Sequence, residues 1–293
     1  MKWNAMGRLL LYSLLVVALA AIMIGVWSAP RDELAALKAA MQQHGLTAAN
    51  IAYGGANAQP ALGSVNAPDG TVRPFYSLSK PITAAAALQV LDLDQEIEGA
   101  RARQLLQHSG GWDRALAGDP VTQHSGRGDC TALPVPEKQF RPGERYAYSN
   151  LGYCLLGRAI AEATGKSFQD SVAGLFPETA AMSFDPSLGP AGGWSGTVSA
   201  YFRFASRPLP EGTDQDPITR PNDLPYGLGW AIGPDFVTHF GALRSNFSIV
   251  VKQGDFVAVG TFDGRPKNDA AAARDLRAAL LELNTLAEPQ GPH

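Results

Sequence analysis

The sequence predicts an α+β protein in which an antiparallel sheet is flanked by N- and C-terminal helices. Strand-like apolar runs lie near both ends of the chain, within residues 51–65 and 228–262. The middle, about residues 94–225, is rich in Pro and Gly and has few long periodic segments. Strands at both ends with helices between them favour one sheet and a reduced, mostly helical lobe.

Local patterns define the elements of the N-terminal part. Residues 31–44 carry apolar side chains at helical spacing, and Gly45 ends this amphipathic helix. Two short strands follow at 51–55 and 61–65, with a turn around Gln59-Pro60 between them. The chain becomes helical again at Ser77–Leu93, directly after a short strand.

The rest of the chain divides into helices, one loop and four strands. Further helices are predicted at 100–108, 151–164, 168–175 and 269–286. Residues 207–225, dense in Pro, Asp and Gly, are predicted as a long surface loop. The strands that follow are predicted at Leu228–Ile232, Phe236–Phe240, Asn246–Lys252 and Phe256–Phe262.

The N-terminus predicts export. Residues 9–27 contain no charge and follow Lys2 and Arg8. This length is close to the roughly 20 apolar residues of a spanning helix, and the charge order keeps the N-terminus inside. Residues 1–30 are therefore predicted as a signal anchor in the inner membrane. The domain that follows would then lie outside the cytoplasm. A cleaved signal peptide, giving a secreted or periplasmic protein, is the alternative.

The remaining composition bounds the domain count and the partners. Residues 31–286 of the 293 suit one domain, and 287–293 are predicted as a disordered tail. A formal net charge of −3 gives no basic surface for nucleic acid. The two cysteines, Cys130 and Cys154, lack metal-site spacing. They form either one disulfide or two separate buried thiols. We expect no metal and no cofactor, and the sequence leaves the oligomeric state open.

The first candidate for chemistry is the pair Ser77 and Lys80. A serine three residues before a lysine at a helix start places both side chains on one face. A serine hydroxyl needs a nearby base, and a desolvated lysine can lose its proton near neutral pH. Pro81 supports a helix start at this point. The competing interpretation is a capping serine followed by a surface lysine.

Two later segments add polar groups to this pair. Tyr148 and Asn150 precede a predicted helix; a tyrosine beside an ammonium has its phenolate favoured, and an asparagine can bind a substrate amide. His239 and Gly241 lie at the end of a strand, where glycine allows close approach of a substrate. A capping asparagine in a turn and a structural histidine are the alternative interpretations.

Four ordered segments together resemble the serine β-lactamase and penicillin-binding protein superfamily, in the branch of class C β-lactamases, D-aminopeptidases and related esterases. The spacing fits across residues 33–286. The segments are FYSLSKPITA at 75–84, LLQHSGG at 105–111, residues 142–157 with Tyr148-x-Asn150, and His239-x-Gly241 in place of Lys-Thr-Gly.

The resemblance implies a β-lactamase/transpeptidase-like fold and an acyl-enzyme on Ser77. Lys80 and Tyr148 would then move its proton, and the backbone N–H groups of Ser77 and Ala242 would form the oxyanion hole. Asn150, His239 and Gly241 would bind the substrate. His108 and Ser109 are interpreted as structural.

The sequence also departs from that pattern. The link Leu91–Arg103 is short, a histidine replaces the lysine at 239, and no second acidic base is evident. These departures argue against an efficient β-lactamase and favour hydrolysis of an ester, an amide or a D-amino-acid peptide. The alternative is a non-catalytic binding or sensor protein of this fold at the membrane.

Overall fold

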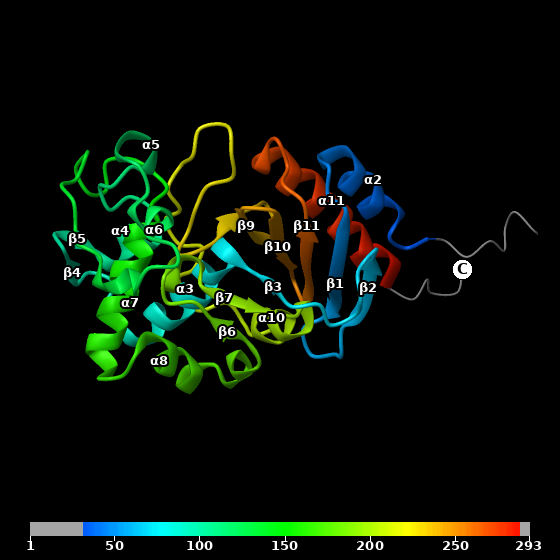
Figure 1. Cartoon of the computed structure of the whole chain (residues 1–293), viewed down its shortest axis with the longest axis horizontal. Coiled ribbons are helices and arrows are strands. Elements are labelled where there is room, and N and C mark those ends of the chain that lie inside the picture. Colours follow the sequence, from blue (N-terminus) through cyan, green and yellow to red (C-terminus); the bar gives the residue numbers. More distant parts are fainter. Residues whose placement is uncertain (1–31, 288–293) are drawn as a thin grey trace, which may run out of the picture. The chain divides into compact units, whose positions relative to one another are not determined.

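The fold is described over residues 32–287 in a computed structural model (Figure 1). The chain divides into Met1–Ala35 and a second unit that begins at Ala36. The predicted anchor at 1–30 and the predicted tail beyond Ala287 lie outside the described residues. Within 32–287, no helix combines the length and the apolar character needed to cross a bilayer.

A six-stranded antiparallel sheet forms one part of this unit. Its order is β2-β1-β11-β10-β9-β8, so strands from both ends of the chain pair at its centre. In Figure 1 these are the blue and orange arrows side by side. The strands are β1 (Ala48–Gly55), β2 (Ala61–Val65), β8 (Ala231–Ile232), β9 (Val237–Leu243), β10 (Asn246–Gln253) and β11 (Phe256–Asp263).

Both faces of the central strands are buried, which explains their almost uninterrupted apolar sequence. Val250 and Val259 belong to the core shared with the helical part, whereas the alternate residues Ile249 and Val251 are buried outside that cluster. Helix α11 (Asp269–Ala287) packs against β1, β9, β10 and β11. Helix α2 (Ala35–His44) runs beside α11 in Figure 1.

The helical part is organised around α7 (Asn150–Thr164), which contacts α3, α4, α8 and α9. Ser149 caps its first turn by accepting a hydrogen bond from the Gly152 N–H, and Gly165 ends it in the left-handed conformation. The other helices are α3 (Ser79–Val90), α4 (Ala102–Leu106), α5 (Arg114–Ala117), α6 (Pro120–Gln123), α8 (Phe168–Leu175), α9 (Gly189–Gly192) and α10 (Val198–Ala205).

Some elements differ from the sequence-based expectation. The strand predicted at 228–232 shortens to β8, because Gly229 takes a φ of +87° and approaches Ala84 of α3 too closely for a side chain. The short strand predicted before Ser77 is β3 (Arg73–Pro74), but its partners in a small sheet, β7 (Trp194–Gly196) and β6 (Ser183–Phe184), were not predicted. Helix α10 falls inside the predicted helical lobe but packs on β1 and β11 of the main sheet.

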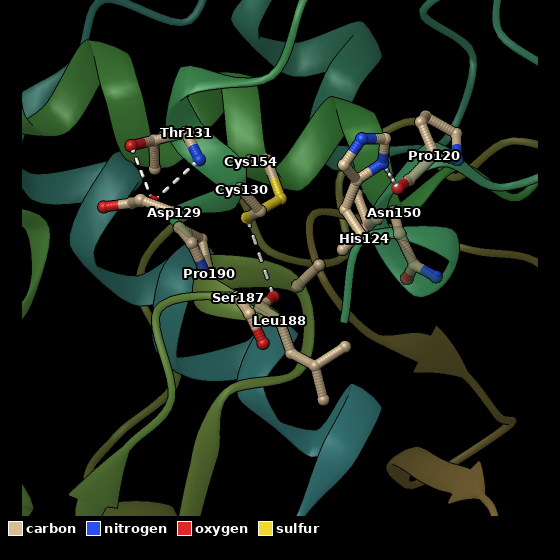
Figure 2. The surroundings of a disulfide bond; sticks show 12 residues. Pro120, His124, Asp129, Cys130, Thr131, Asn150, Cys154, Ser187, Leu188 and Pro190 are labelled. Carbon is tan, nitrogen blue, oxygen red and sulfur yellow. Dashed lines mark hydrogen bonds between the residues drawn. A yellow bond between two sulfur atoms is a disulfide. The ribbon is translucent and has the colours of Figure 1, made fainter. Parts of the chain in front are cut away.

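One disulfide joins Cys130 to Cys154, and thereby the short 3-10 helix η2 (Cys130–Ala132) to α7 (Figure 2). Of the two arrangements left open by the sequence, the structure has the bridge. The Cys130 Sγ atom lies 3.7 Å from the carbonyl oxygen of Leu188, which precedes α9. At Gly189 an added Cβ would lie 2.6 Å from the same sulfur. The bridge therefore packs directly between α7 and α9.

We predict that Cys130→Ala combined with Cys154→Ala lowers the free energy of unfolding by about 3 kcal/mol, because the bridge closes a loop between residues 24 apart. Urea titration of the oxidised wild type and the double variant measures this difference. Alkylation of the non-reduced protein followed by mass determination is the control. Two alkylated thiols in the wild type would contradict the assignment.

Candidate active site

Ser77 lies in η1 (Tyr76–Leu78), the 3-10 turn that leads into α3. The preceding residue, Tyr76, has a φ of +49°, a conformation that costs energy for a bulky side chain. This bend brings Ser77 to the edge of β9, which contacts η1. The serine is therefore presented on a constrained turn.

Several buried contacts fix this turn to the rest of the protein. The Tyr201 hydroxyl donates to the Leu78 carbonyl over 2.7 Å, and the Trp194 N–H donates to Ser79 Oγ over 3.1 Å. On the side of the main sheet, Ser248 Oγ donates to the Phe75 carbonyl over 2.6 Å. Elements from three parts of the chain thus hold the backbone on both sides of Ser77.

Lys80 is fully buried beneath Ser77. Its Nζ lies 3.3 Å from Ser77 Oγ, 2.7 Å from Asn150 Oδ1 and 2.7 Å from the Ala191 carbonyl oxygen. Burial lowers the pKa of Lys80 well below its ordinary value, because desolvation penalises the ammonium; the Asp119 carboxylate opposes this shift. A neutral amine at hydrogen-bond distance from a serine hydroxyl can act as its general base.

Tyr148 completes the contact with the serine, but not in the form expected from the sequence. Its hydroxyl lies 2.6 Å from Ser77 Oγ. The expected phenolate is not favoured: desolvation raises the pKa of Tyr148 above its ordinary value, although Arg114 acts in the opposite direction. The expectation assumed a charged lysine beside the ring. Burial favours the neutral form of both Lys80 and Tyr148, so Tyr148 is a phenol that can relay a proton.

Asp119 is a site residue that the sequence analysis missed. Asn150, the first residue of α7, accepts from Lys80 and donates through Nδ2 to Asp119 Oδ2. The other carboxylate oxygen caps α6 by accepting from the Val121 N–H over 3.2 Å. The sequence does carry a signal here, since Asp before Pro120 is typical of a helix start, but it indicates a cap and not a partner for Asn150.

The predicted oxyanion-hole residues lie where β9 passes η1. Strand β8 pairs with β9 only at Val237 and Thr238, so the β9 edge beyond them is free to face Ser77. An added Cβ on Gly241 would come within 2.2 Å of the Phe75 carbonyl oxygen and 2.7 Å of the Ser77 nitrogen. Only glycine permits this approach, which brings the backbone of the next residue, Ala242, into the same cleft as Ser77.

His239 is held by the protein itself. Its Nδ1 lies 3.0 Å from the Phe240 carbonyl oxygen, so this nitrogen carries the proton, and Nε2 accepts from the Tyr226 hydroxyl at 2.8 Å. Burial lowers the pKa of His239 to about 3, so the ring is neutral at physiological pH. Both ring nitrogens are engaged by the protein, so neither is free for the predicted binding of a substrate. The ring lines the cleft and supplies no positive charge.

His108 packs against the loop that carries Tyr148. Its Nδ1 accepts from the Ser149 N–H at 3.2 Å, and its ring lies against Tyr148 with centroids 4.3 Å apart. The neighbouring Ser109 carbonyl accepts from the Gly143 N–H over 2.8 Å. Both residues therefore fix the loop that carries Tyr148, as a structural role requires.

These groups open into a cleft of about 890 Å³. Its lining includes Ser77, Tyr148, His239 and Ala242, together with Arg114 and residues of the loop at 220–224. Lys80 and Asn150 lie beneath this surface, within hydrogen-bond distance of each other. Within residues 32–287, no three His, Cys, Asp or Glu side chains come together as a metal site.

Comparison with known proteins relates the first half of this chain to a family. The family model described as Beta-lactamase matches residues 31–176. The predicted resemblance to the serine β-lactamase and penicillin-binding protein superfamily is thereby confirmed. A curated relative, the probable fimbrial assembly protein FimD of serogroup H1 from Dichelobacter nodosus, is 34% identical over 118 residues. The match covers 32% of this chain and only 30% of that protein.

Solved structures share the fold at low sequence identity. The D-amino acid amidase from Ochrobactrum anthropi SV3 has a TM-score of 0.69 at 18% identity, over 87% of this chain and 99% of that one. The β-lactamase/D-alanine carboxypeptidase from Yersinia pestis has a TM-score of 0.66 at 14% identity, over 84% and 96%. These likenesses support the predicted β-lactamase-like α+β fold.

We predict that Gly241→Ala lowers kcat at least about 100-fold, because the new methyl group collides with the Phe75 carbonyl oxygen and the Ser77 backbone nitrogen. Hydrolysis of nitrophenyl esters measures the effect. Gly174→Ala is the matched control, since nothing lies within 4 Å of the added methyl group there. Thermal unfolding of both variants separates a local effect from loss of the fold, and a folded, active Gly241→Ala would contradict the placement.

We predict that Asp119→Asn moves the acidic limb of the kcat/KM profile to lower pH. The Asp119 charge stabilises the Lys80 ammonium, so its removal lowers the pKa of Lys80 further, and the base stays neutral in more acidic solution. The amide oxygen of the variant can still accept from Asn150. Asp170→Asn, an exposed position in α8, controls for the change in net charge. An unshifted or oppositely shifted limb would refute the coupling.

Proposed function

We propose that this chain, which belongs with the serine β-lactamase and penicillin-binding protein superfamily, is a serine hydrolase that forms an acyl-enzyme on Ser77. One observation carries the proposal. The Ser77 hydroxyl lies between a buried amine with a lowered pKa, Lys80, and the Tyr148 phenol, at 3.3 and 2.6 Å. A plain capping serine would need neither partner. This arrangement supplies the activated nucleophile that acyl transfer requires.

In the acylation step, the neutral Lys80 amine takes the Ser77 proton while Oγ bonds to the carbonyl carbon of the substrate. The N–H groups of Ser77 and Ala242 stabilise the oxyanion that forms on the carbonyl oxygen. When the oxyanion collapses, the bond to the leaving group breaks. The proton held by Lys80 passes through the Tyr148 hydroxyl to that leaving group, and the amine is neutral again.

Deacylation repeats these steps with water in place of the serine. Water attacks the ester carbonyl, and its proton passes through Tyr148 to Lys80. Collapse of the second oxyanion releases the acid, and Lys80 returns the proton to Ser77 Oγ. Tyr148 therefore acts as a relay between two groups and does not need to be a phenolate.

The substrates we propose are esters, amides or D-amino-acid peptides. The names of the structural neighbours, an amidase and a β-lactamase/carboxypeptidase, support this range. A β-lactam could acylate Ser77, but the neutral His239 leaves that end of the cleft without the cation that the family's lysine provides. Asn150 already accepts a hydrogen bond from Lys80 and donates one to Asp119. It would therefore act on the substrate indirectly, by orienting the Lys80 amine.

We further propose that the domain works outside the cytoplasm, held at the inner membrane by residues 1–30. The apolar run of residues 9–27 supports this location. The Cys130–Cys154 bridge supports it independently, because such bonds persist in oxidising compartments. A non-catalytic binding or sensor role is the second candidate. It is favoured by the partial match to a relative named as a fimbrial assembly protein.

We predict that a fluorophosphonate probe labels the wild type and that Ser77→Ala abolishes the labelling. Lys80→Ala should also lose it, since the serine then lacks its base, while the protein still folds. Ser64→Ala, an exposed serine in β2, is the matched control and should label normally. A wild type that is neither labelled nor active on nitrophenyl esters would instead support the non-catalytic role.

A further inference from the structure

The cleft contains one guanidinium close to the nucleophile that no carboxylate neutralises. Arg114 is exposed at the start of α5 and lines the cleft together with Ser77. Its Cζ lies 4.3 Å from the ring centroid of Tyr148, whose hydroxyl contacts Ser77 Oγ. Stacking on the ring restricts the arginine side chain, so its charge is held one aromatic ring away from the nucleophile.

The acidic side chains nearest in sequence are engaged by other groups. Asp113 pairs with Arg145 at 2.9 Å and caps α5 through the Ala115 N–H. Asp119 accepts from Asn150 and from the Val121 N–H. Within residues 32–287, Arg114 forms no ion pair. The donors of its guanidinium therefore remain available to a ligand in the cleft.

The other cationic side chains of the cleft either pair with a carboxylate or lie at its α11 end. Arg220 pairs with Asp223, and Arg274 pairs with Asp275 at 2.9 Å. Arg277 stacks on the Phe236 ring at 4.9 Å, at the end of the cleft formed by α11. His239 is held neutral on the β9 side by its two protein partners. The unneutralised positive charge beside Ser77 therefore comes from α5 and not from β9.

We propose that Arg114 binds a carboxylate group of the substrate that Ser77 attacks, which assigns the substrate class as anionic. The statement that Ser77 attacks this substrate rests on the proposed hydrolase function. The binding of a carboxylate by Arg114 does not depend on it. The planar guanidinium can form two parallel N–H···O bonds with a carboxylate. The neutral ring of His239 cannot form such a pair of bonds. Because Arg114 is exposed, binding should weaken as salt concentration rises.

Binding is tested without catalysis. Ser77→Ala protein is titrated with N-trifluoroacetylglycine and with its neutral amide, which differ only in the carboxylate, and the two dissociation constants are measured by fluorine NMR. We expect the carboxylate to bind about tenfold more tightly than the amide. Adding Arg114→Gln should remove this preference, and Arg114→Lys should retain part of it. Arg127→Gln, an exposed arginine outside the cleft lining, is the matched control and should retain all of it.

Catalysis provides the second readout. The ratio of kcat/KM for the nitrophenyl monoester of glutaric acid to that for nitrophenyl butyrate reports the anionic preference independently of the intrinsic rate. We expect Arg114→Gln to lower this ratio about tenfold and Arg127→Gln to leave it unchanged. The wild-type ratio should fall as the salt concentration is raised about tenfold, from roughly 50 to roughly 500 mM.

The two experiments fail in distinguishable ways. Equal binding of the carboxylate and the amide, or a preference that survives Arg114→Gln, overturns the role of Arg114 whether or not the protein is a hydrolase. A carboxylate preference that depends on Arg114, in a protein that hydrolyses neither ester, supports the anion site. That result would count against the proposed hydrolase function instead.

Discussion

The burial of the Lys80 amine is the constraint on which the rest of the site depends. A lysine without contact to water needs acceptors for its protons, and burial also lowers its pKa; both apply to Lys80. Its acceptors come from three separate places: Ser77 in the turn before α3, Asn150 at the start of α7, and the Ala191 carbonyl in α9. Whatever holds these three elements together also determines whether the amine can act as a base.

The disulfide and the close packing around it meet that requirement. The Cys130–Cys154 bridge ties η2 to α7 one turn after Asn150, and Gly189 lets α9 pack directly on the sulfur. On the opposite side, the main sheet reaches the site through Gly241 and Ser248, which contact the backbone just before Ser77. Ser77 is therefore held between a cross-linked helical part and a sheet whose two faces are both buried.

The charges of the site follow from the same burial. Desolvation lowers the pKa of Lys80 and of His239 and raises that of Tyr148, so burial favours the neutral form of all three groups. The positive charge next to the nucleophile then belongs to Arg114, which remains at the surface and stacks on Tyr148. In the proposed mechanism, the buried residues Lys80 and Tyr148 transfer protons. The exposed Arg114 recognises the charge of the substrate.

The sequence by itself determined the sheet strands, the terminal helix and the nucleophile segment, because these depend on local periodicity and on residue order within a few turns. The boundaries of the helix at 168–175 and the pairing of Ser77 with Lys80 required no distant contact. Asp119 and Arg114 could not be identified in this way. Their spacing from Ser77 carries no pattern, and they reach the site only through the folding of the middle region.

Only the tertiary structure decided the protonation states and the disulfide. A tyrosine near a lysine favours a phenolate if the lysine is charged, and a neutral relay if it is buried; sequence spacing does not report burial. Likewise, Cys130 and Cys154 can bridge only where their backbones approach, here to a Cα–Cα distance of 5.7 Å. The sequence thus named the groups proposed to react, and the fold shifts their pKa values, because desolvation depends on everything packed around them.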